Sequence, residues 1–503
     1  LLGDHMLADK IQNQKLRHLT NDQPPLLKVI GTMKHLAGAK ALVSAFQINK
    51  PEYAWKHKDF KVEDKNDLVI YEMLFRDFTK SQDIAGVMSR LDYIENLGVN
   101  AVELMPIQEF DGNDSWGYNP CFYFATDKAY GTDEAYKYFI DECHKRGIAV
   151  IVDVVFNHAT GQHPYAKMWW DAGANKTNSQ NPFFNVDAPH NWSVFHDFNH
   201  TYQYTVEYID DVLEYWMEEY NVDGFRFDLT KGFVQNPSNY DAGGYSAQRI
   251  GILKHYAETI RAVDEDAYII FEHFCDQSEE NELYNSVGAL CWNNNQRNGY
   301  KQSVLGFTGS SFADFKKGRI NNIETHDEER IAYDAVKYAQ SWAKPWDVLT
   351  KRLQAVYAFH FLTPYPKMMW QFGELGYDVS IEENGRTGKK PVRWNYYNDA
   401  NRKALYDAMS KVISWRTSHE EYYGQDNLTV HTWSVGDAQM GGKVLVMDKV
   451  IVVANFSNDQ STTSVNVPSA GEWTNLMTGE KVQLGSSHSF TLGASDYIVL
   501  VKE

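Results

Sequence analysis

Short apolar runs alternate with longer amphipathic stretches through the middle of the chain. The runs rich in β-branched and aromatic residues predict strands, and the stretches between them, with apolar positions three or four residues apart, predict helices. The predicted strands are Leu68–Met73, Ala101–Met105, Ala149–Phe156, Gly224–Asp228, Tyr268–Glu272, Leu290–Asn293, Asn321–Thr325 and Lys367–Gln371.

This alternation is typical of βα units, and eight such strands predict an α/β protein built on a (β/α)8 TIM barrel. Two of the connecting helices are predicted over Thr132–Arg146 and Thr205–Tyr220. In the first of them, Phe139 and Cys143 lie on one apolar stripe, and Gly147 follows as a stop signal. We expect the barrel to occupy residues 67–417.

Two regions depart from this rhythm. Residues 159–203 form a long connection rich in Asn, Pro, His and Trp, which predicts a short inserted domain. After residue 418 the pattern alternates with period two, so 418–503 is expected to be a separate all-β sandwich with strands at Val444–Met447, Val450–Asn455, Ser464–Val467 and Tyr497–Val501. Residues 1–66 show no periodicity, and we interpret them as an N-terminal extension or the remnant of an upstream domain.

Charge and composition exclude several classes of function. The formal net charge of −19 argues against a nucleic-acid partner, because nothing resembles a basic patch that would neutralise phosphates. No apolar run is long enough for a transmembrane helix. No export signal is visible at the start, so the compartment stays open, as does the oligomeric state. Aromatic residues make up 14% of the chain, which suits the stacking of neutral sugars.

Candidate chemistry gathers at the carboxyl ends of four predicted strands, where TIM barrels carry their active sites. A single acid there is more often a helix cap, and a lone histidine is more often a satisfied polar residue. Three carboxylates converging on one rim would cost stability in a purely structural barrel, so together they favour catalysis. The strand ends carry Asp153, Asn157 and His158; Arg226 and Asp228; Glu272 and His273; and His326 and Asp327.

Position suggests a role for two of these acids. Arg226 and Asp228 are two residues apart and therefore share a strand face, where the guanidinium would keep Asp228 ionised as a nucleophile. Repulsion from Asp228 would favour the protonated form of Glu272 on the next strand, as a general acid requires. Carboxylates roughly 5–5.5 Å apart give retention of configuration, and adjacent strands about 4.8 Å apart are compatible with that separation.

Taken as a set, these segments resemble the motif regions of glycoside hydrolase family 13, the α-amylase family. The resemblance implies Asp228 as nucleophile, Glu272 as acid/base and Asp327 as transition-state stabiliser. It also covers Ser115–Pro120, which follows the second predicted strand. The implied substrate-binding residues are Tyr118, His158, Arg226, Lys231, His326 and Trp116, with Trp370 and Gln371 as further candidates; for the tryptophans, core packing is an equal alternative.

The same resemblance makes residues 159–203 the domain B of the family and implies a structural Ca²⁺. Its ligands would be Asn157, Asp197 and the carbonyl of Gly232, since Ca²⁺ takes hard oxygen ligands. The alternative is that Asn157 and Asp197 only hydrogen-bond the loop to the barrel.

The chain departs from the common α-amylase pattern at two positions. Thr325 stands where Asn is common, and Gly232 stands where many members have His. We therefore expect an α-glucan substrate and retaining endo-hydrolysis of α-1,4-glucosidic bonds, with a glucan-branching transglycosidase or an α-1,6 debranching enzyme as alternatives. A non-catalytic carbohydrate-binding protein is disfavoured because Asp228, Glu272 and Asp327 are all present.

Overall fold

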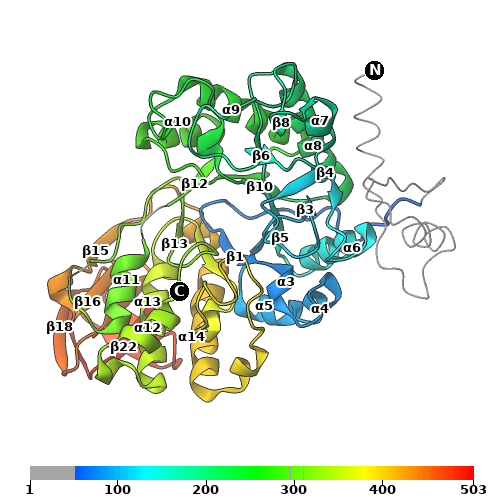
Figure 1. Ribbon diagram of the computed structural model, residues 1–503. Coiled ribbons are helices and arrows are strands. Elements are labelled where there is room, and N and C mark those ends of the chain that lie inside the picture. The colour runs from blue at the N-terminus through cyan, green and yellow to red at the C-terminus, as the bar shows by residue number, and fades with distance from the viewer. Residues whose placement is uncertain (1–50, 294–295, 310) are drawn as a thin grey trace. The chain divides into compact units, whose positions relative to one another are not determined.

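The computed structural model describes residues 51–293, 296–309 and 311–503, in which eight parallel strands form a closed barrel (Figure 1). Their order around the barrel is β1-β14-β13-β12-β11-β10-β5-β2, so strands that follow one another along the chain are neighbours. Their bounds are β1 (Val69–Met73), β2 (Ala101–Leu104), β5 (Ala149–Val154), β10 (Gly224–Phe227), β11 (Tyr268–Phe271), β12 (Leu290–Trp292), β13 (Arg319–Asn322) and β14 (Lys367–Trp370). The expected fold class is thus confirmed.

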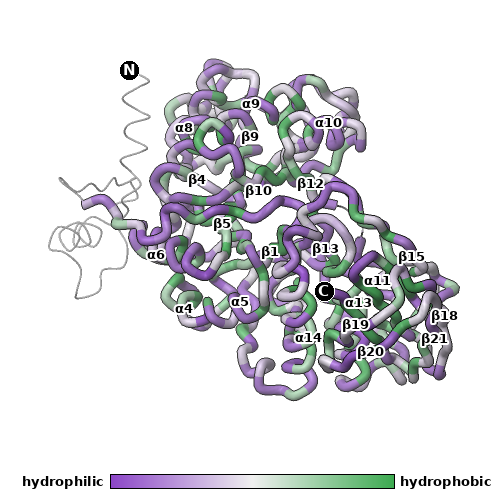
Figure 2. The backbone as a smooth tube through the Cα atoms, turned by 180° about the vertical axis from the view of Figure 1, so that it is seen from behind, coloured by the Kyte–Doolittle hydropathy of each residue, from purple (hydrophilic) through white to green (hydrophobic). Residues whose placement is uncertain are grey.

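Apolar sequence accounts for most of these strands. Every residue of β5 is buried, and the tube in Figure 2 is green along it because alanine, valine and isoleucine fill all but one position. Strands buried on both faces are expected to be continuously apolar. The exception is Asp153, a polar position inside the strand.

One strand begins earlier than the sequence predicted. Strand β13 covers Arg319–Asn322 rather than Asn321–Thr325. Its polar residues are nevertheless buried, because Asn321 Oδ1 accepts hydrogen bonds from the amides of Asn293, at 3.0 Å, and Gln296, at 3.1 Å. Hydrophobic periodicity cannot locate a strand whose buried side chains are amides.

Helices follow the barrel strands in the expected alternation. The helix predicted over Thr132–Arg146 is α6, and the one predicted over Thr205–Tyr220 is α8. The longer helices between and after the strands are α5 (Leu91–Leu97), α6 (Asp133–His144), α8 (Gln203–Tyr220), α9 (Ala247–Val263), α10 (Gln277–Val287), α11 (Arg297–Leu305), α12 (Ile331–Tyr338), α13 (Trp346–Leu362) and α14 (Ala400–Thr417).

The connection between β5 and α8 holds only short elements. Strands β6 (His158–Ala159) and β9 (His196–Asp197) pair antiparallel, as do β7 (Trp170–Asp171) and β8 (Lys176–Thr177). The short helix α7 (Pro164–Met168) precedes the second pair. This segment corresponds to the insertion predicted at about 159–203.

Two antiparallel sheets make up the C-terminal part, coloured orange to red in Figure 1. Trp473 from the larger sheet and Phe490 from the smaller one belong to a single buried cluster, which identifies the arrangement as a sandwich. The larger sheet has the order β15 (Val430–Ser434), β16 (Lys443–Met447), β17 (Val450–Ala454), β22 (Tyr497–Val501), β19 (Gly471–Asn475) and β20 (Lys481–Leu484), and the smaller one pairs β18 (Ser461–Asn466) with β21 (Ser487–Leu492).

The residues pack as two compact units, which are considered separately below. Most of the first unit is Met73–Leu91 and Val102–Trp292, and the second comprises Glu63–Glu72, Asp92–Ala101 and Asn293–Glu503. The N-terminal extension expected at 1–66 lies outside the described residues up to residue 50, and residues 51–66 contain neither helix nor strand. Among the described residues, no helix has the length and apolarity needed to span a membrane.

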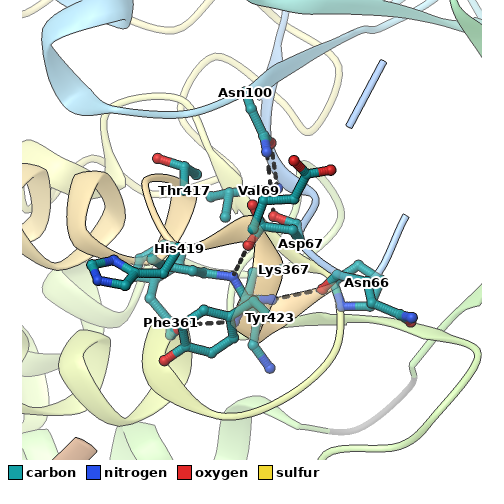
Figure 3. Close-up of polar contacts among 12 residues, drawn as sticks. Asn66, Asp67, Val69, Asn100, Phe361, Lys367, Thr417, His419 and Tyr423 are labelled. Carbon is teal, nitrogen blue, oxygen red and sulfur yellow. Dashed lines mark hydrogen bonds and ion pairs between the residues drawn. The ribbon is translucent and has the colours of Figure 1, made fainter. Parts of the chain in front are cut away.

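A buried arginine fixes the start of β1 in the second unit. Arg416, in α14, donates to the backbone carbonyls of Asn66, Phe361, Thr363 and Tyr365 over 2.8–2.9 Å. Figure 3 shows the surrounding polar contacts. Through Nη1 and Nη2 this guanidinium ties three chain segments together, and its Nε lies 3.6 Å from Asp67 Oδ1, so the buried cation also faces a carboxylate.

A buried acid in the same unit makes stability depend on pH. Glu374 follows β14, and its Oε1 accepts hydrogen bonds from the hydroxyls of Tyr71, at 2.9 Å, and Tyr93, at 2.6 Å. Burial raises the pKa of Glu374 from an ordinary value of 4.5 to about 7, although both hydroxyls act in the opposite direction. The folded protein therefore holds a proton here that the unfolded chain has already lost between those two pH values.

We predict that the free energy of unfolding falls as pH rises from about 4.5 through about 7, and that Glu374→Gln removes this contribution. The variant should be comparable to the wild type near the lower limit and relatively more stable above pH 7. Urea denaturation at a series of pH values measures the free energy of unfolding of the wild type and of the variant. A stability difference that does not change across this window would contradict the prediction.

Candidate functional site

Arg226 is the centre of a charged cluster in the first unit. It lies in β10 directly opposite Asp153 of β5, and its side chain is fully buried. Its Nη1 donates to Asp153 Oδ1 at 2.9 Å and Oδ2 at 3.0 Å, and to Asp228 Oδ1 at 2.9 Å. The guanidinium thus binds two carboxylates at once: that of Asp228, just after its own strand, and that of Asp153, in the neighbouring strand β5.

Glu272 joins this cluster from the neighbouring strand. Glu272 directly follows β11 in the chain. Its Oε2 atom lies 3.1 Å from Arg226 Nη2. The same oxygen accepts the backbone N–H of Leu229 at 2.9 Å. Leu229 has a positive φ of 48°, an unusual conformation for a non-glycine residue and one that often occurs at functional sites. Glu272 thus contacts one cation and one neutral donor, and both act against the effect of the repulsion expected from Asp228.

Aromatic rings complete the surroundings of Arg226. The Cζ atom lies 4.3 Å from the centre of the Trp292 ring and 5.9 Å from that of Tyr118, whose hydroxyl donates to Asp153 Oδ2 at 2.7 Å. Burial alone would lower the pKa of the Arg226 guanidinium, but Coulombic attraction to Asp153, Glu272 and Asp228 raises it well above its ordinary range. The cation is therefore permanent.

His158 adjoins the cluster in an uncharged form. Its Nε2 lies 2.9 Å from the carbonyl oxygen of Tyr118, which can only accept, so the Nε2 atom carries the proton. Burial lowers the pKa of His158 to about 4. At neutral pH this imidazole has no net charge and is oriented by the backbone beside Tyr118.

Lys231 and Trp116 are the other substrate-binding residues predicted in this unit. Lys231 Nζ forms an ion pair of 3.0 Å with Asp241 Oδ2 and lies 4.4 Å from the centre of the Trp192 ring. The indole N–H of Trp192 donates to the carbonyl of Asp241, which links the two loops. Trp116 is buried, as its alternative interpretation as a packing residue expects.

The second unit contains His326 and Asp327, which follow β13. His326 Nδ1 lies 2.5 Å from Glu72 Oε1 at the end of β1, and its backbone N–H donates to Glu72 Oε2 at 3.2 Å. Asp327 is partly exposed, with Oδ2 3.4 Å from His326 Nε2 and Oδ1 3.2 Å from Arg386 Nη2.

Three residues of these clusters, Glu72, Trp292 and Arg386, were not among the sequence candidates, and Asp153 was noted at a strand end without a role. Asp153 and Glu72 lie within strands, and their only signal was a carboxylate in an otherwise apolar run. Trp292 resembles an ordinary core residue, and Arg386 lies in a loop with no local signal.

The residues expected to bind Ca²⁺ are close together. Asn157 Oδ1 lies only 1.8 Å from the position that a Cβ would occupy at Gly232, so a side chain there would require Asn157 to move. The Oδ1 atoms of Asn157 and Asp197 are buried without a hydrogen-bond partner. Such orphaned oxygens fit a cation, because burying them unpaired is unfavourable. His190 Nε2 lies 3.3 Å from Asp197 Oδ1.

Comparison with known families agrees with this geometry. The model of the α-amylase catalytic domain matches residues 69–196, and the model of the α-amylase C-terminal all-β domain matches residues 441–501. The chain belongs to glycoside hydrolase family 13, the α-amylase family. The homologues indicate an enzyme of this class. The first match ends before Asp228, so the roles of later residues are inferred from their positions.

Relatives within the family are diverse. A malto-oligosyltrehalose trehalohydrolase of Saccharolobus solfataricus is 32% identical over 191 residues, which are 38% of this chain and 32% of that protein. The matched part thus spans about a third of that relative's length. A 1,4-α-glucan branching enzyme of Rhodopseudomonas palustris is 23% identical over 500 residues, covering 93% of this chain and 66% of its own.

Solved structures show the same fold. The α-amylase of Geobacillus thermoleovorans, complexed with acarbose, has a TM-score of 0.68 at 18% identity and covers 88% of this chain and 99% of its own. Pullulanase type I of Bacillus subtilis, complexed with maltose, has the same TM-score and identity, and the match covers 92% of this chain and 73% of the pullulanase.

We predict that Arg226→Met lowers the free energy of unfolding by about 3–5 kcal/mol at neutral pH, because it leaves buried carboxylates uncompensated. The loss should shrink at acidic pH as these groups protonate. Arg226→Lys is the matched control, which keeps the charge without the forked geometry. Urea denaturation measures all three proteins, and equal stability of wild type and Met variant at neutral pH would refute the compensating role.

Proposed function

We propose that this enzyme hydrolyses α-1,4-glucosidic bonds within α-glucans, with retention of configuration through a covalent glycosyl-enzyme intermediate. The observation that carries the proposal is the sharing of the Arg226 guanidinium by Asp228 and Glu272, which come from adjacent strand ends. Paired carboxylates of this kind serve as nucleophile and acid/base in retaining glycosidases.

In the first step, Asp228 attacks the anomeric carbon while Glu272 gives a proton to the departing glycosidic oxygen. Arg226, 2.9 Å from Asp228 Oδ1, stabilises the negative charge of the nucleophile. Glu272 then removes a proton from water, which attacks the intermediate and releases the sugar. Asp327 is assigned to transition-state stabilisation, and Tyr118, His158 and His326 to binding the sugar at the cleavage point.

A branching transglycosidase is the second candidate, using the same intermediate but a sugar hydroxyl instead of water as acceptor. It is favoured by the near full-length similarity to the branching enzyme of Rhodopseudomonas palustris. An α-1,6 debranching activity is the third candidate, since the chain also resembles a pullulanase in fold.

We predict that Asp228→Asn lowers kcat by at least about 1,000-fold without unfolding the protein, the order expected when a nucleophile is removed. Glu272→Gln should also be severe on starch, but its glycosylation step should recover with substrates whose leaving group needs no protonation. Stopped assays with soluble starch and an activated aryl maltooligoside measure both. Near-normal starch hydrolysis by Asp228→Asn would exclude it as nucleophile.

Amylose as sole substrate distinguishes the candidate reactions. Hydrolysis should release reducing ends and short linear maltooligosaccharides. Branching would lower iodine staining, produce almost no reducing ends, and create α-1,6 signals in proton NMR spectra. Those signals without reducing sugar would replace the hydrolase assignment by the branching one. Cleavage of pullulan but not of amylose would favour debranching.

We further propose a structural Ca²⁺ held by Asn157, Asp197 and the carbonyl of Gly232. The buried Oδ1 atoms of Asn157 and Asp197, neither of which accepts a hydrogen bond, support it; Asp197 Oδ1 lies 3.3 Å from His190 Nε2. When bound, the ion would supply a positive charge that fixes the insertion against β5, and it takes no part in bond cleavage.

A chelator should therefore lower Tm, because a ligand that binds only the native state stabilises it by mass action. Asp197→Ala should lower Tm and remove its dependence on Ca²⁺. Elemental analysis without Ca²⁺, together with a wild-type Tm indifferent to chelator, would argue instead that His190 alone satisfies Asp197.

A further inference from the structure

Glu72 is a buried carboxylate whose contacts both end on one residue. It lies in β1 with no exposed surface. Its Oε1 lies 2.5 Å from Nδ1 of His326, and its Oε2 accepts the backbone N–H of His326 at 3.2 Å. A buried carboxylate is costly unless hydrogen-bonded, and here the compensation comes from a single histidine.

These two contacts determine the state of the imidazole. An ionised carboxylate can only accept hydrogen bonds, so Nδ1 must carry the proton that lies between the two groups. The second contact fixes the backbone from which the ring extends. The remaining ring nitrogen, Nε2, lies 3.4 Å from Asp327 Oδ2. Nε2 therefore faces Asp327. The hydrogen bond at Nδ1 determines which of the two ring nitrogens of His326 carries the proton.

A purely structural role would leave a different pattern of contacts. Glu374, another fully buried acid of the same unit, accepts from the hydroxyls of Tyr71 and Tyr93 on two separate elements. It therefore links segments of the fold. Glu72 instead orients a side chain to which a substrate contact is assigned.

We propose that Glu72 is a positioning residue for the glycosidase reaction. It holds the proton on Nδ1 of His326 and fixes the ring, so that Nε2 meets a hydroxyl of the sugar at the cleavage point. This inference rests on the proposed function, because it acts through the substrate contact of His326.

The variant Glu72→Gln tests the role. The two donors of His326 contact different oxygens of Glu72. In a glutamine one of these oxygens becomes an NH₂ group, which only donates, so one of the two contacts is lost in this geometry. We expect kcat on amylose to fall about tenfold to hundredfold with little change in KM, since a contact that strengthens in the transition state affects kcat. The matched control is Glu374→Gln, the same change at a buried acid away from His326, which should leave kcat unchanged.

A double-mutant cycle separates action through His326 from an independent effect. His326→Asn should reduce kcat, and adding Glu72→Gln to it should cause no further loss. A double variant whose loss equals the product of the two single losses would overturn the proposal, as would an unchanged kcat in Glu72→Gln. Circular dichroism and Tm confirm that the compared variants are folded.

NMR of the wild-type protein provides a test that needs no substrate and does not depend on the folding of Glu72→Gln. With ¹⁵N-labelled histidine, the resonances of His326 are assigned by their loss in His326→Asn and should show a protonated Nδ1. An unprotonated Nδ1 would overturn the proposal. If the wild type acted on no α-glucan, the proposed function would fail, whereas this spectrum would still decide whether Glu72 sets the state of His326.

Discussion

The buried charge of Arg226 is the constraint on which the first unit's chemistry depends. Three carboxylates, those of Asp153, Asp228 and Glu272, lie within ion-pair distance of one guanidinium. Without that cation, their mutual repulsion and their loss of water would oppose gathering them in a barrel interior. Asp153 lies within β5, whereas Asp228 and Glu272 stand at the ends of their strands, where the proposed chemistry would take place.

Two histidines illustrate how the surroundings give the same side chain different properties. His158 donates from Nε2 to a backbone carbonyl and is neutral, because burial opposes its charge. His326 has a carboxylate at Nδ1 and another near Nε2. The two imidazoles, one in each unit, are thus held by partners of different charge, a neutral carbonyl and a carboxylate.

The sequence predicted the barrel because apolar runs mark most of its strands, and it predicted Arg226, Asp228 and Glu272 because catalytic groups gather at strand ends. It placed β13 incorrectly because that strand buries amides rather than apolar groups. Strand β21 was missed because its polar residues alternate weakly. The contact between Leu229 N–H and Glu272 depends on a backbone conformation that has no signal in side-chain pattern. Asp153 and Glu72 were overlooked as partners because partnership is a property of neighbouring strands, not of local sequence.

The hydrogen bonds that Arg416 donates to backbone carbonyls also have a consequence for biosynthesis. One of them joins Asn66, at the entrance to the first barrel strand, to a helix 350 positions further along the chain. Such a long separation makes the contact slow to form, since a large loop must close before it yields any stabilisation. During synthesis, β1 can pair with β2 and then with β14 before α14 has been made, whereas the carbonyl of Asn66 gains its buried donor only with α14. Pairing of the first barrel strand and the anchoring of its entrance are therefore separate events in the order of synthesis.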